Sequence, residues 1–407
     1  MRGAALLLLG SLVLLGAPAV APEDREPQLC LTVLDVGQGD ALLVSLPGGE
    51  RWLVDGGGVR GGGYDVGRYK VLPALRRLGV DRLDRVFVTH GDADHFEGLF
   101  AVLAALPVGE LWVPTRRSLS ARMGALVADA ERLGVPLRVV DEGAVLPAAP
   151  RPVRAQLLHP WPGWAVGEAD EATGSNDGSI VLRVALGDVA MLLTGDIEAP
   201  AEERLAEAGR LAPAAVLKVP HHGSKTSSTP ALLDRVRPLV AVAGAGADNR
   251  YGFPHASVAA RYGRAGAPLY WTGRHGALRV CTDGWSIHVE QAGESLRWSS
   301  LRRWSVDEVA GWSAESVEAP VLQPVAARCE VPERGRRRTR ARGASKSKRK
   351  PKSKGKSKGK PKAKSTGSAS ASPTPPPGPE APSLAPDREW ERARRTRGRL
   401  KAPWKGR

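Results

Sequence analysis

Cysteine is scarce in this 407-residue chain, which contains only Cys30, Cys281 and Cys329. Three widely spaced cysteines form neither a disulfide framework nor a zinc knuckle. One disulfide bond is permissible if the chain reaches an oxidising compartment, and buried or incidental thiols are an equally open alternative. The sequence also has no internal repeat, which excludes a repeat architecture.

Long hydrophobic runs are also absent, since no segment reaches the about 20 apolar residues that a membrane-spanning helix needs. The N-terminal run Ala4–Leu15 is short, follows a basic start and precedes an Ala-Val-Ala sequence at 19–21. This order is typical of a secretory signal peptide. We therefore expect residues 1–21 to be a signal peptide and the protein to be exported, to the periplasm or the exterior. An uncleaved N-terminal anchor is the alternative.

Acidic residues are rare at the C-terminal end. Residues 331–407 hold 26 Lys and Arg against 5 Asp and Glu, a net +21, so residues 1–330 carry −5 of the total +16. A Lys/Ser/Gly-, Pro- and Arg-rich segment buries too little apolar surface to order itself, and we expect a disordered tail. Its candidate partners are DNA and acidic cell-envelope polymers or anionic lipid. A solvated tail without specific function is the alternative.

Residues 30–290 are predicted to form one α/β unit, because short Val/Leu-rich runs alternate with helical stretches and turn clusters. The predicted strands are 31–36, 41–46, 51–54, 83–89, 110–113, 136–140, 153–158, 179–185, 189–194, 215–219 and 239–243, and the predicted helices are 69–78 and 96–106. Residues 291–330 form a predicted C-terminal extension, in which one helix could cover part of the domain.

A loop after the predicted strand 83–89 collects four potential metal ligands within six residues. They are His90, Asp92, Asp94 and His95. Extended chain would place the first three on one side, with His95 at the turn into the next helix. Two imidazoles and two carboxylates suit divalent first-row metals. Helix capping would explain one Asp but not the whole set, so the motif predicts a metal site.

Three other strand ends carry similar side chains. Asp196 follows strand 189–194, where a carboxylate can bridge two metals about 3.5–4 Å apart. His221 and His222 follow strand 215–219, and one of them can bind metal while the other contacts substrate or donates a proton. His159 ends strand 153–158, and on its own a hydrogen-bonded loop histidine is the more common interpretation.

Six short motifs occur in a fixed order within residues 30–285. They are LDVGQGD (34–40), VDGG (54–57), THGDADH (89–95), LTGD (193–196), VPHHGS (219–224) and NRYG (249–252). In this order they resemble the metallo-β-lactamase domain at the C-terminus of ComEC competence proteins. The resemblance implies an α/β fold of the four-layer αββα sandwich type, with the site at one edge of the two sheets. It also implies a dinuclear metal centre and hydrolysis of a DNA strand during uptake.

The resemblance assigns roles to residues of this chain. The implied metal ligands are His90, Asp92, Asp94, His95, His159, Asp196 and His221. Asp40 and Asp55 are implied to support them through hydrogen bonds. The implied substrate-binding residues are Asn176, Lys218, Ser224 and Asn249. The implied catalytic residues are Asp94, His222 and His255, and either histidine could protonate the leaving group.

Two divalent metal ions, Zn or Mn, would activate a bridging water to a hydroxide nucleophile. The leading hypothesis is therefore an exported metal-dependent hydrolase, a phosphodiesterase or nuclease acting on DNA. The alternatives are a hydrolase of a small substrate, such as a β-lactam, an ester or a small phosphodiester, because the fold hosts many chemistries. A non-catalytic cell-envelope binding protein anchored by its basic tail is a third possibility.

Two departures from the competence pattern qualify the resemblance. The multi-helix membrane channel of those proteins has no counterpart in the sequence, so DNA translocation is not expected. Phe253 stands where the family usually has His, although His255 follows two residues later. One acid/base or phosphate contact is therefore in question.

Overall fold

The computed structural model describes residues 28–61, 63–115, 120–141, 145–147, 149, 152–161 and 176–315. All of them belong to the first of two units, Met1–Leu322. The predicted signal peptide, the basic tail and Cys329 lie outside the described residues. Within the described ranges, no helix is both long and apolar enough to cross a membrane.

Two β-sheets form the centre of the fold. The nine-stranded sheet has the order β15-β14-β13-β1-β2-β3-β4-β5-β6, and the six-stranded sheet has the order β12-β11-β10-β9-β8-β7. The first sheet contains β1 (Leu29–Val33), β2 (Leu42–Ser45), β3 (Arg51–Val54), β4 (Leu83–Phe87), β5 (Val108–Val113), β6 (Leu137–Val139), β13 (Ala277–Thr282), β14 (Ile287–Ala292) and β15 (Trp298–Trp304). The second contains β7 (Arg154–His159), β8 (Val181–Leu186), β9 (Val189–Leu193), β10 (Val216–Lys218), β11 (Val240–Ala243) and β12 (Leu269–Trp271).

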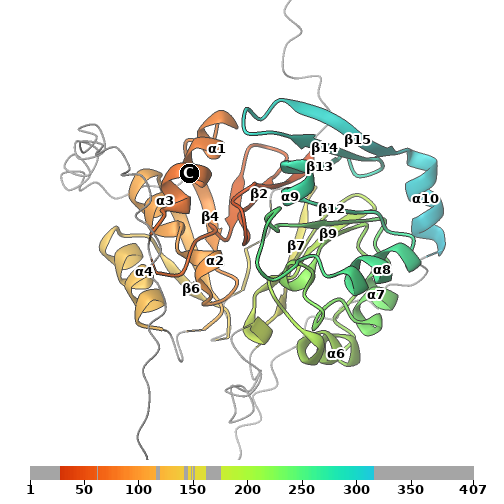
Figure 1. Ribbon diagram of the computed structural model, residues 1–407, viewed down its shortest axis with the longest axis horizontal. Coiled ribbons are helices and arrows are strands. Elements are labelled where there is room, and N and C mark those ends of the chain that lie inside the picture. The colour runs from red at the N-terminus through yellow and green to blue at the C-terminus, as the bar shows by residue number, and fades with distance from the viewer. Residues whose placement is uncertain are drawn as a thin grey trace, which may run out of the picture. The chain divides into compact units, whose positions relative to one another are not determined.

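Helices cover the outer face of each sheet (Figure 1). The orange and yellow helices beside the first sheet are η2 (Gly67–Val71), α1 (Leu72–Arg77), α2 (Ala93–Phe96), α3 (Leu99–Ala105) and α4 (Ala121–Arg132). The green helices beside the second sheet are α6 (Ala199–Glu207), α7 (Pro230–Val236) and α8 (Ala256–Arg264). The short elements η3 (Asn176–Gly178), η4 (Pro220–Gly223) and α9 (Thr272–His275) lie in connections, and α10 (Val306–Glu315) comes last. This arrangement confirms the expected αββα sandwich.

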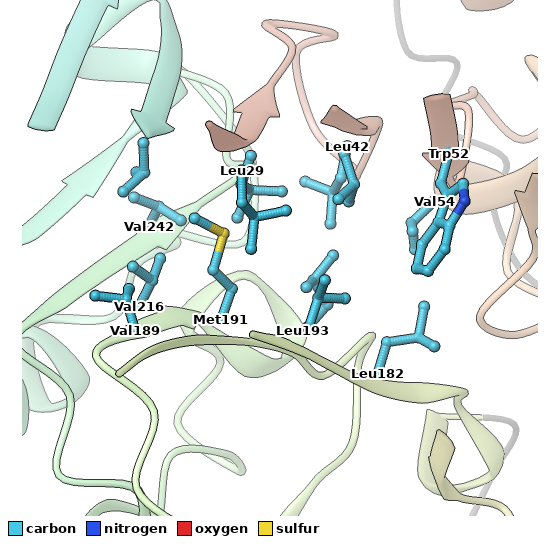
Figure 2. Close-up of a cluster of buried hydrophobic side chains, with 14 of the residues drawn as sticks. Leu29, Leu42, Trp52, Val54, Leu182, Val189, Met191, Leu193, Val216 and Val242 are labelled. Carbon is cyan, nitrogen blue, oxygen red and sulfur yellow. The ribbon is translucent and has the colours of Figure 1, made fainter. Parts of the chain in front are cut away.

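Alternation along the strands builds the three apolar layers. In β9, Val189, Met191 and Leu193 join the core between the two sheets, while Ala190 and Leu192 join the core under α6 to α8. Successive side chains of a strand point to opposite faces, so a strand that is apolar throughout serves two layers. Figure 2 shows the inter-sheet layer, in which Met191 and Leu193 from the second sheet meet Leu29 and Leu42 from the first. A third core cluster lies between the first sheet and helices α1 to α4.

The C-terminal extension contributes a strand as well as a helix to the domain. Residues Trp298–Trp304 form the edge strand β15, which pairs with β14, and Trp304 is buried in the inter-sheet core. In the α10 helix, Trp312 Nε1 donates a hydrogen bond of 2.7 Å to the Arg237 carbonyl. The extension therefore adds an edge strand to the first sheet and contacts the end of α7, although only a helix was predicted for it.

A disulfide bond joins Cys30 and Cys281. The two cysteines are directly opposed in the antiparallel pair of β1 and β13. The bond links positions 251 residues apart, and so it ties the first strand of the domain to one of its last. Of the two interpretations left open by the sequence, the structure supports a single disulfide.

Candidate metal centre

The predicted ligand loops meet at one edge of the two sheets. The loop with His90 to His95 follows β4 of the first sheet, whereas Asp196 follows β9 and His222 follows β10 of the second. Parallel strands bring their carboxyl ends to a common edge, which is why these loops converge. Among the described residues, a buried cluster of Asp40, His95, Asp196 and His222 has its ligand atoms within 4.8 Å of one another.

Three atoms of this cluster converge on one small volume. His95 Nε2 and His222 Nε2 each lie 3.1 Å from Asp196 Oδ2, and the two nitrogens are 3.2 Å apart. Ligands about 2.0–2.1 Å from a tetrahedral zinc ion would be about 3.3 Å from one another. The spacing and the donor types therefore fit a divalent cation.

Asp55 holds the ring of His95 in the orientation that such a site needs. His95 Nδ1 donates to Asp55 Oδ2 over 2.8 Å, which leaves the Nε2 lone pair for a metal. Thr89 also donates to this carboxylate, from its backbone N at 2.8 Å and from Oγ1 at 2.7 Å. Asp55 has a left-handed backbone with φ 60°, a conformation that aspartate adopts more readily than most residues other than glycine. Its carboxylate thus makes the kind of hydrogen bond expected of a supporting residue.

The remaining residues of the first loop surround this point. His90 Nε2 is buried without a hydrogen-bond partner and lies 3.8 Å from Asp92 Oδ2. Burial, together with the charge of His95, lowers the pKa of His90 to about 4, so the ring is neutral at pH 7. Asp94 Oδ2 lies 3.6 Å from His222 Nε2. Asp92 stands at the N-cap position of α2 but makes no capping hydrogen bond through its side chain, which argues against a mere capping role.

The two adjacent histidines point to different places. His222 is buried within the cluster, whereas His221 is 22% exposed and its Nε2 is 3.9 Å from Asp196 Oδ2. Both have left-handed backbones, with φ 45° and 52°, a conformation that costs about 1–3 kcal/mol for each such residue. Sequence reasoning chose His221 as the ligand. The structure instead brings His222 to the other donors, because the tight turn separates the two rings.

His221 is held by a carboxylate that sequence reasoning missed. Its Nδ1 lies 2.6 Å from Glu198 Oε1, and the same oxygen accepts a 2.9 Å hydrogen bond from Thr226 Oγ1. The bond from His221 lowers the pKa of Glu198 despite partial burial. Its position two residues after Asp196 was the available signal, since extended chain places residues i and i+2 on one side.

Lys218 is buried together with Asp40 and Asp196, and these three residues are called the floor of the site. It is 0% exposed, forms an ion pair with Asp40 and lies 3.2 Å from Asp196 Oδ1. Its Nζ also donates to the Gly195 carbonyl over 2.8 Å. The expectation that Lys218 faces the substrate is therefore wrong, because both carboxylates enclose its ammonium. Asp40 acts as its partner within the cluster rather than as a remote support.

Charges of opposite sign control the protonation of this floor. Burial alone would raise the pKa of Asp196, but His222, His95 and Lys218 hold it well below its ordinary value. Burial would lower the pKa of His95 and of His222, yet Asp196 and a second carboxylate beside each ring raise both. Asp94 likewise has a lowered pKa, since the hydrogen bond from His222 and the charges of His95 and His222 together outweigh its burial.

Two other predicted site residues serve the local backbone. The Asn249 side-chain amide donates to the Gly246 and Phe253 carbonyls, each over 2.7 Å, and its oxygen accepts from Phe253 N at 2.8 Å. Both amide donors are thus used within the loop, which contradicts a substrate contact through them. His255 caps α8 by accepting from Ser257 N over 3.3 Å, so its ring is not placed among the cluster residues.

The last three predicted residues lie on the second-sheet side. His159 is buried, and its Nδ1 donates to the Ser179 carbonyl over 2.7 Å. Burial lowers the pKa of His159 to about 4, so this ring is neutral as a metal ligand must be. Ser224 Oγ is 2.7 Å from Thr226 Oγ1, and Asn176 hydrogen-bonds Glu198. Ser224 and Asn176 therefore both belong to the network around Glu198.

The sheet order and the site correspond to a known family. The model of the metallo-beta-lactamase superfamily matches residues 34–246, which is more than half of the chain. The chain therefore belongs to the metallo-β-lactamase superfamily and is a metal-dependent hydrolase of that group.

Its relatives narrow the group further. The ComE operon protein 3 of Bacillus subtilis (strain 168) is 28% identical over 258 residues, covering 61% of this chain and 32% of that protein. Recombination protein 2 of Haemophilus influenzae is 32% identical over 270 residues, covering 66% and 30%. Competence protein ComA of Neisseria gonorrhoeae is 31% identical over 284 residues, covering 68% and 36%. The expected resemblance to ComEC-type domains is confirmed, and the chain spans about a third of the length of these relatives.

Proposed function

We propose that this chain is an exported phosphodiesterase that hydrolyses DNA with two divalent metal ions. The observation that carries the proposal is the convergence of His95, Asp196 and His222 within 3.2 Å. The names of the relatives, competence and recombination proteins, support DNA as the polymer. No observation on the described residues favours a β-lactam or a small ester instead.

The donor set divides between two ions. His95, His222 and Asp94 would hold one ion, and His90, Asp92 and His159 would hold the other. Asp196 lies beside the first set, with Oδ2 3.1 Å from both His95 Nε2 and His222 Nε2, and its carboxylate would help to hold the ions. When bound, the ions would supply Lewis-acid activation of a phosphate oxygen and of water. Zinc or manganese suits this mixture of imidazole and carboxylate ligands.

Around the ions, side chains of this chain would position the substrate and move a proton. We assign the proton transfer to His221 rather than to His222 or His255, because His221 is part-exposed at the rim and Glu198 orients it. With Nδ1 bonded to Glu198, His221 Nε2 is the atom that would protonate the leaving oxygen. Lys218 and Asp55 would keep the floor rigid and correctly charged.

Export is supported by two features. The N-terminal segment has the composition of a signal peptide, and the Cys30–Cys281 disulfide is the type of bond that persists outside the reducing cytoplasm. The basic tail would add sequence-independent attraction to the phosphate backbone. Anionic lipid and acidic envelope polymers remain competing targets for the tail.

The test compares the wild-type chain with the Asp196→Asn variant. We expect purified wild-type protein to contain two divalent ions per chain and to cleave single-stranded DNA. In Asp196→Asn, metal content and cleavage rate should both fall. Each decrease should exceed the about 100-fold effect of removing a residue that only hydrogen-bonds a ligand. Asp188→Asn, in the exposed turn at the other end of β9, is the matched control. Unchanged cleavage by Asp196→Asn, or β-lactam turnover with intact DNA, would contradict the proposal.

A further inference from the structure

A column of flat side chains leads from the metal centre toward the surface. The ring of Phe253 stacks against that of His222, with centroids 6.3 Å apart and planes 28° apart. Tyr251 in turn stacks on Phe253, at 5.3 Å and 16°. Tyr251 is 50% exposed. The column therefore connects a buried cluster histidine with a half-exposed aromatic ring.

A cation lies at the outer end of this column. Arg250 Nη2 donates a 2.7 Å hydrogen bond to the Tyr251 hydroxyl, and its guanidinium carbon is 4.9 Å from the centre of that ring. The bond to Tyr251 and, more weakly, the charge of Asp94 raise the pKa of Arg250. An arginine guanidinium is charged at neutral pH whatever its surroundings. Such a group binds phosphate oxygens in a planar fork.

The loop that carries these side chains is fixed to the loop of the two histidines. Asn249 closes the loop through its bonds to Gly246 and Phe253. A Cβ atom on Gly223 would lie 2.7 Å from Pro254 Cβ, so the two loops are in direct contact. His255 N also donates to the Gly223 carbonyl over 2.8 Å. The spacing between Tyr251 and the metal centre is therefore set by rigid contacts.

We propose that Tyr251, backed by Phe253 and flanked by Arg250, is a stacking subsite for a nucleobase of the strand whose phosphate reaches the metal centre. The inference rests on the proposed function and narrows its substrate class to single-stranded nucleic acid. Aromatic side chains bind bases through their flat faces without regard to sequence. In a duplex those faces are covered by neighbouring base pairs, whereas a single strand offers them. Phe253, at the position where a histidine was expected, supplies an uncharged ring between His222 and Tyr251.

The experiment separates base contacts from phosphate contacts. The full-length, metal-loaded protein is titrated with two phosphorothioate-linked single strands of equal length, one carrying thymine bases and one abasic, by fluorescence anisotropy. Both strands have the same charge, so attraction by the basic tail cancels in the ratio of their affinities. Wild-type protein should prefer the base-bearing strand by about 5- to 100-fold.

Three variants test the assignment. Tyr251→Ala should reduce this preference to nearly one without changing the melting temperature, since the ring is half-exposed. Tyr251→Phe keeps the ring and should keep the preference. Trp285→Ala removes an aromatic ring that is 52% exposed. Its neighbour Gly284 contacts the turn between β8 and β9, at the end of these strands away from Asp196. This variant should also keep the preference.

The outcomes distinguish the subsite from the enzyme activity. A wild-type affinity ratio near one, or an unchanged ratio in Tyr251→Ala, would overturn the subsite even if DNA is cleaved. A base preference that depends on Tyr251, in a protein that cleaves no DNA, would retain the subsite and reject the nuclease. Preference for duplex over single strands would also overturn the inference.

Discussion

Two buried carboxylates six residues apart in the sequence lie in opposite electrostatic surroundings. Asp196, in the floor of the metal centre, has Lys218 and two histidines around it, and its pKa is far below the ordinary value. Glu202 in α6 is equally buried, and burial raises its pKa to about 7, although it accepts hydrogen bonds from Ser228 N and Thr229 N over 2.6 Å and 2.7 Å.

The difference shows what makes the floor a cation site. Burial alone drives a carboxyl group toward its neutral form, and backbone hydrogen bonds offset this only in part. A carboxylate stays charged inside the protein where cations surround it. The surroundings of Asp196 therefore keep its carboxylate charged and able to bind a cation, whereas the packed contact between α6 and α7 favours the neutral form of Glu202.

The largest expected effect removes the cation of the floor. Lys218→Met leaves Asp40 and Asp196 without their ammonium partner, which should lower the free energy of unfolding of the metal-free protein by about 3–5 kcal/mol. Saturating zinc or manganese should restore more stability to the variant than to the wild type, because the ion replaces the lost charge. Urea unfolding with and without metal measures both.

Exposed Lys225 provides the matched control. Lys225→Met should change the unfolding free energy by no more than about 0.5 kcal/mol. If Lys218→Met unfolds like Lys225→Met in the absence of metal, the floor does not depend on its ammonium.

A smaller effect is expected from the pH dependence of Glu202. Its pKa of about 7 in the folded state lies above the ordinary value of 4.5 for a free glutamate side chain. Between those pH values the unfolded chain has released a proton that the folded protein keeps. The stability that protonated Glu202 contributes is therefore fully present below about pH 4.5 and is lost as the pH rises to about 7. The total loss is at most about 3 kcal/mol.

Glu202→Gln should flatten this slope, because the amide does not titrate. Unfolding free energies at pH 5 and pH 8 measure the change, and Glu203→Gln, at an exposed neighbouring position, should keep the wild-type slope. Equal slopes in all three proteins would show that the two backbone donors and the charge of nearby Arg261, which also lowers the pKa of Glu202, already offset its burial.

The smallest expected effect concerns the orientation of His95. In Asp55→Asn the amide can donate where the carboxylate accepted, so His95 would move its proton to Nε2 and lose its lone pair for the metal. Metal affinity should fall about 10- to 100-fold, measured by competition with a chelator. Asp81→Asn, at an exposed position, should bind metal as the wild type does.

Much of the fold followed from periodicity. The apolar run of β9 was predicted as a strand with Asp196 after it, and the structure ends β9 at Leu193. The predicted helix 96–106 is divided into α2 and α3, since His95 belongs to a helical turn of its own. In the extension, the pairing of β15 with β14 could not be predicted, because an edge strand of polar composition has little alternating pattern.

The site was predictable only as a set of loops. Ligand types and their order placed His95, Asp196 and the two histidines near one another. Which histidine turns inward could not be predicted, because it depends on two left-handed backbone conformations held by the neighbouring loop. The resemblance assigned Lys218 to the substrate. Its burial could not be predicted, because that burial arises from Asp40, in the loop between β1 and β2 of the other sheet.

By itself the sequence determined the class of this protein, because metal-ligand spacing and placement at strand ends are local properties that can be recognised without knowing the fold. The tertiary structure alone decided which donors share a volume, which cation neutralises them and which rings lead out to solvent. These depend on contacts between residues far apart in the chain, such as Asp40 with Lys218 and Phe253 with His222. The face-to-face packing of the two sheets brings Asp40 to Lys218, and the pairing of β10 with β11 brings the loops of His222 and Phe253 together.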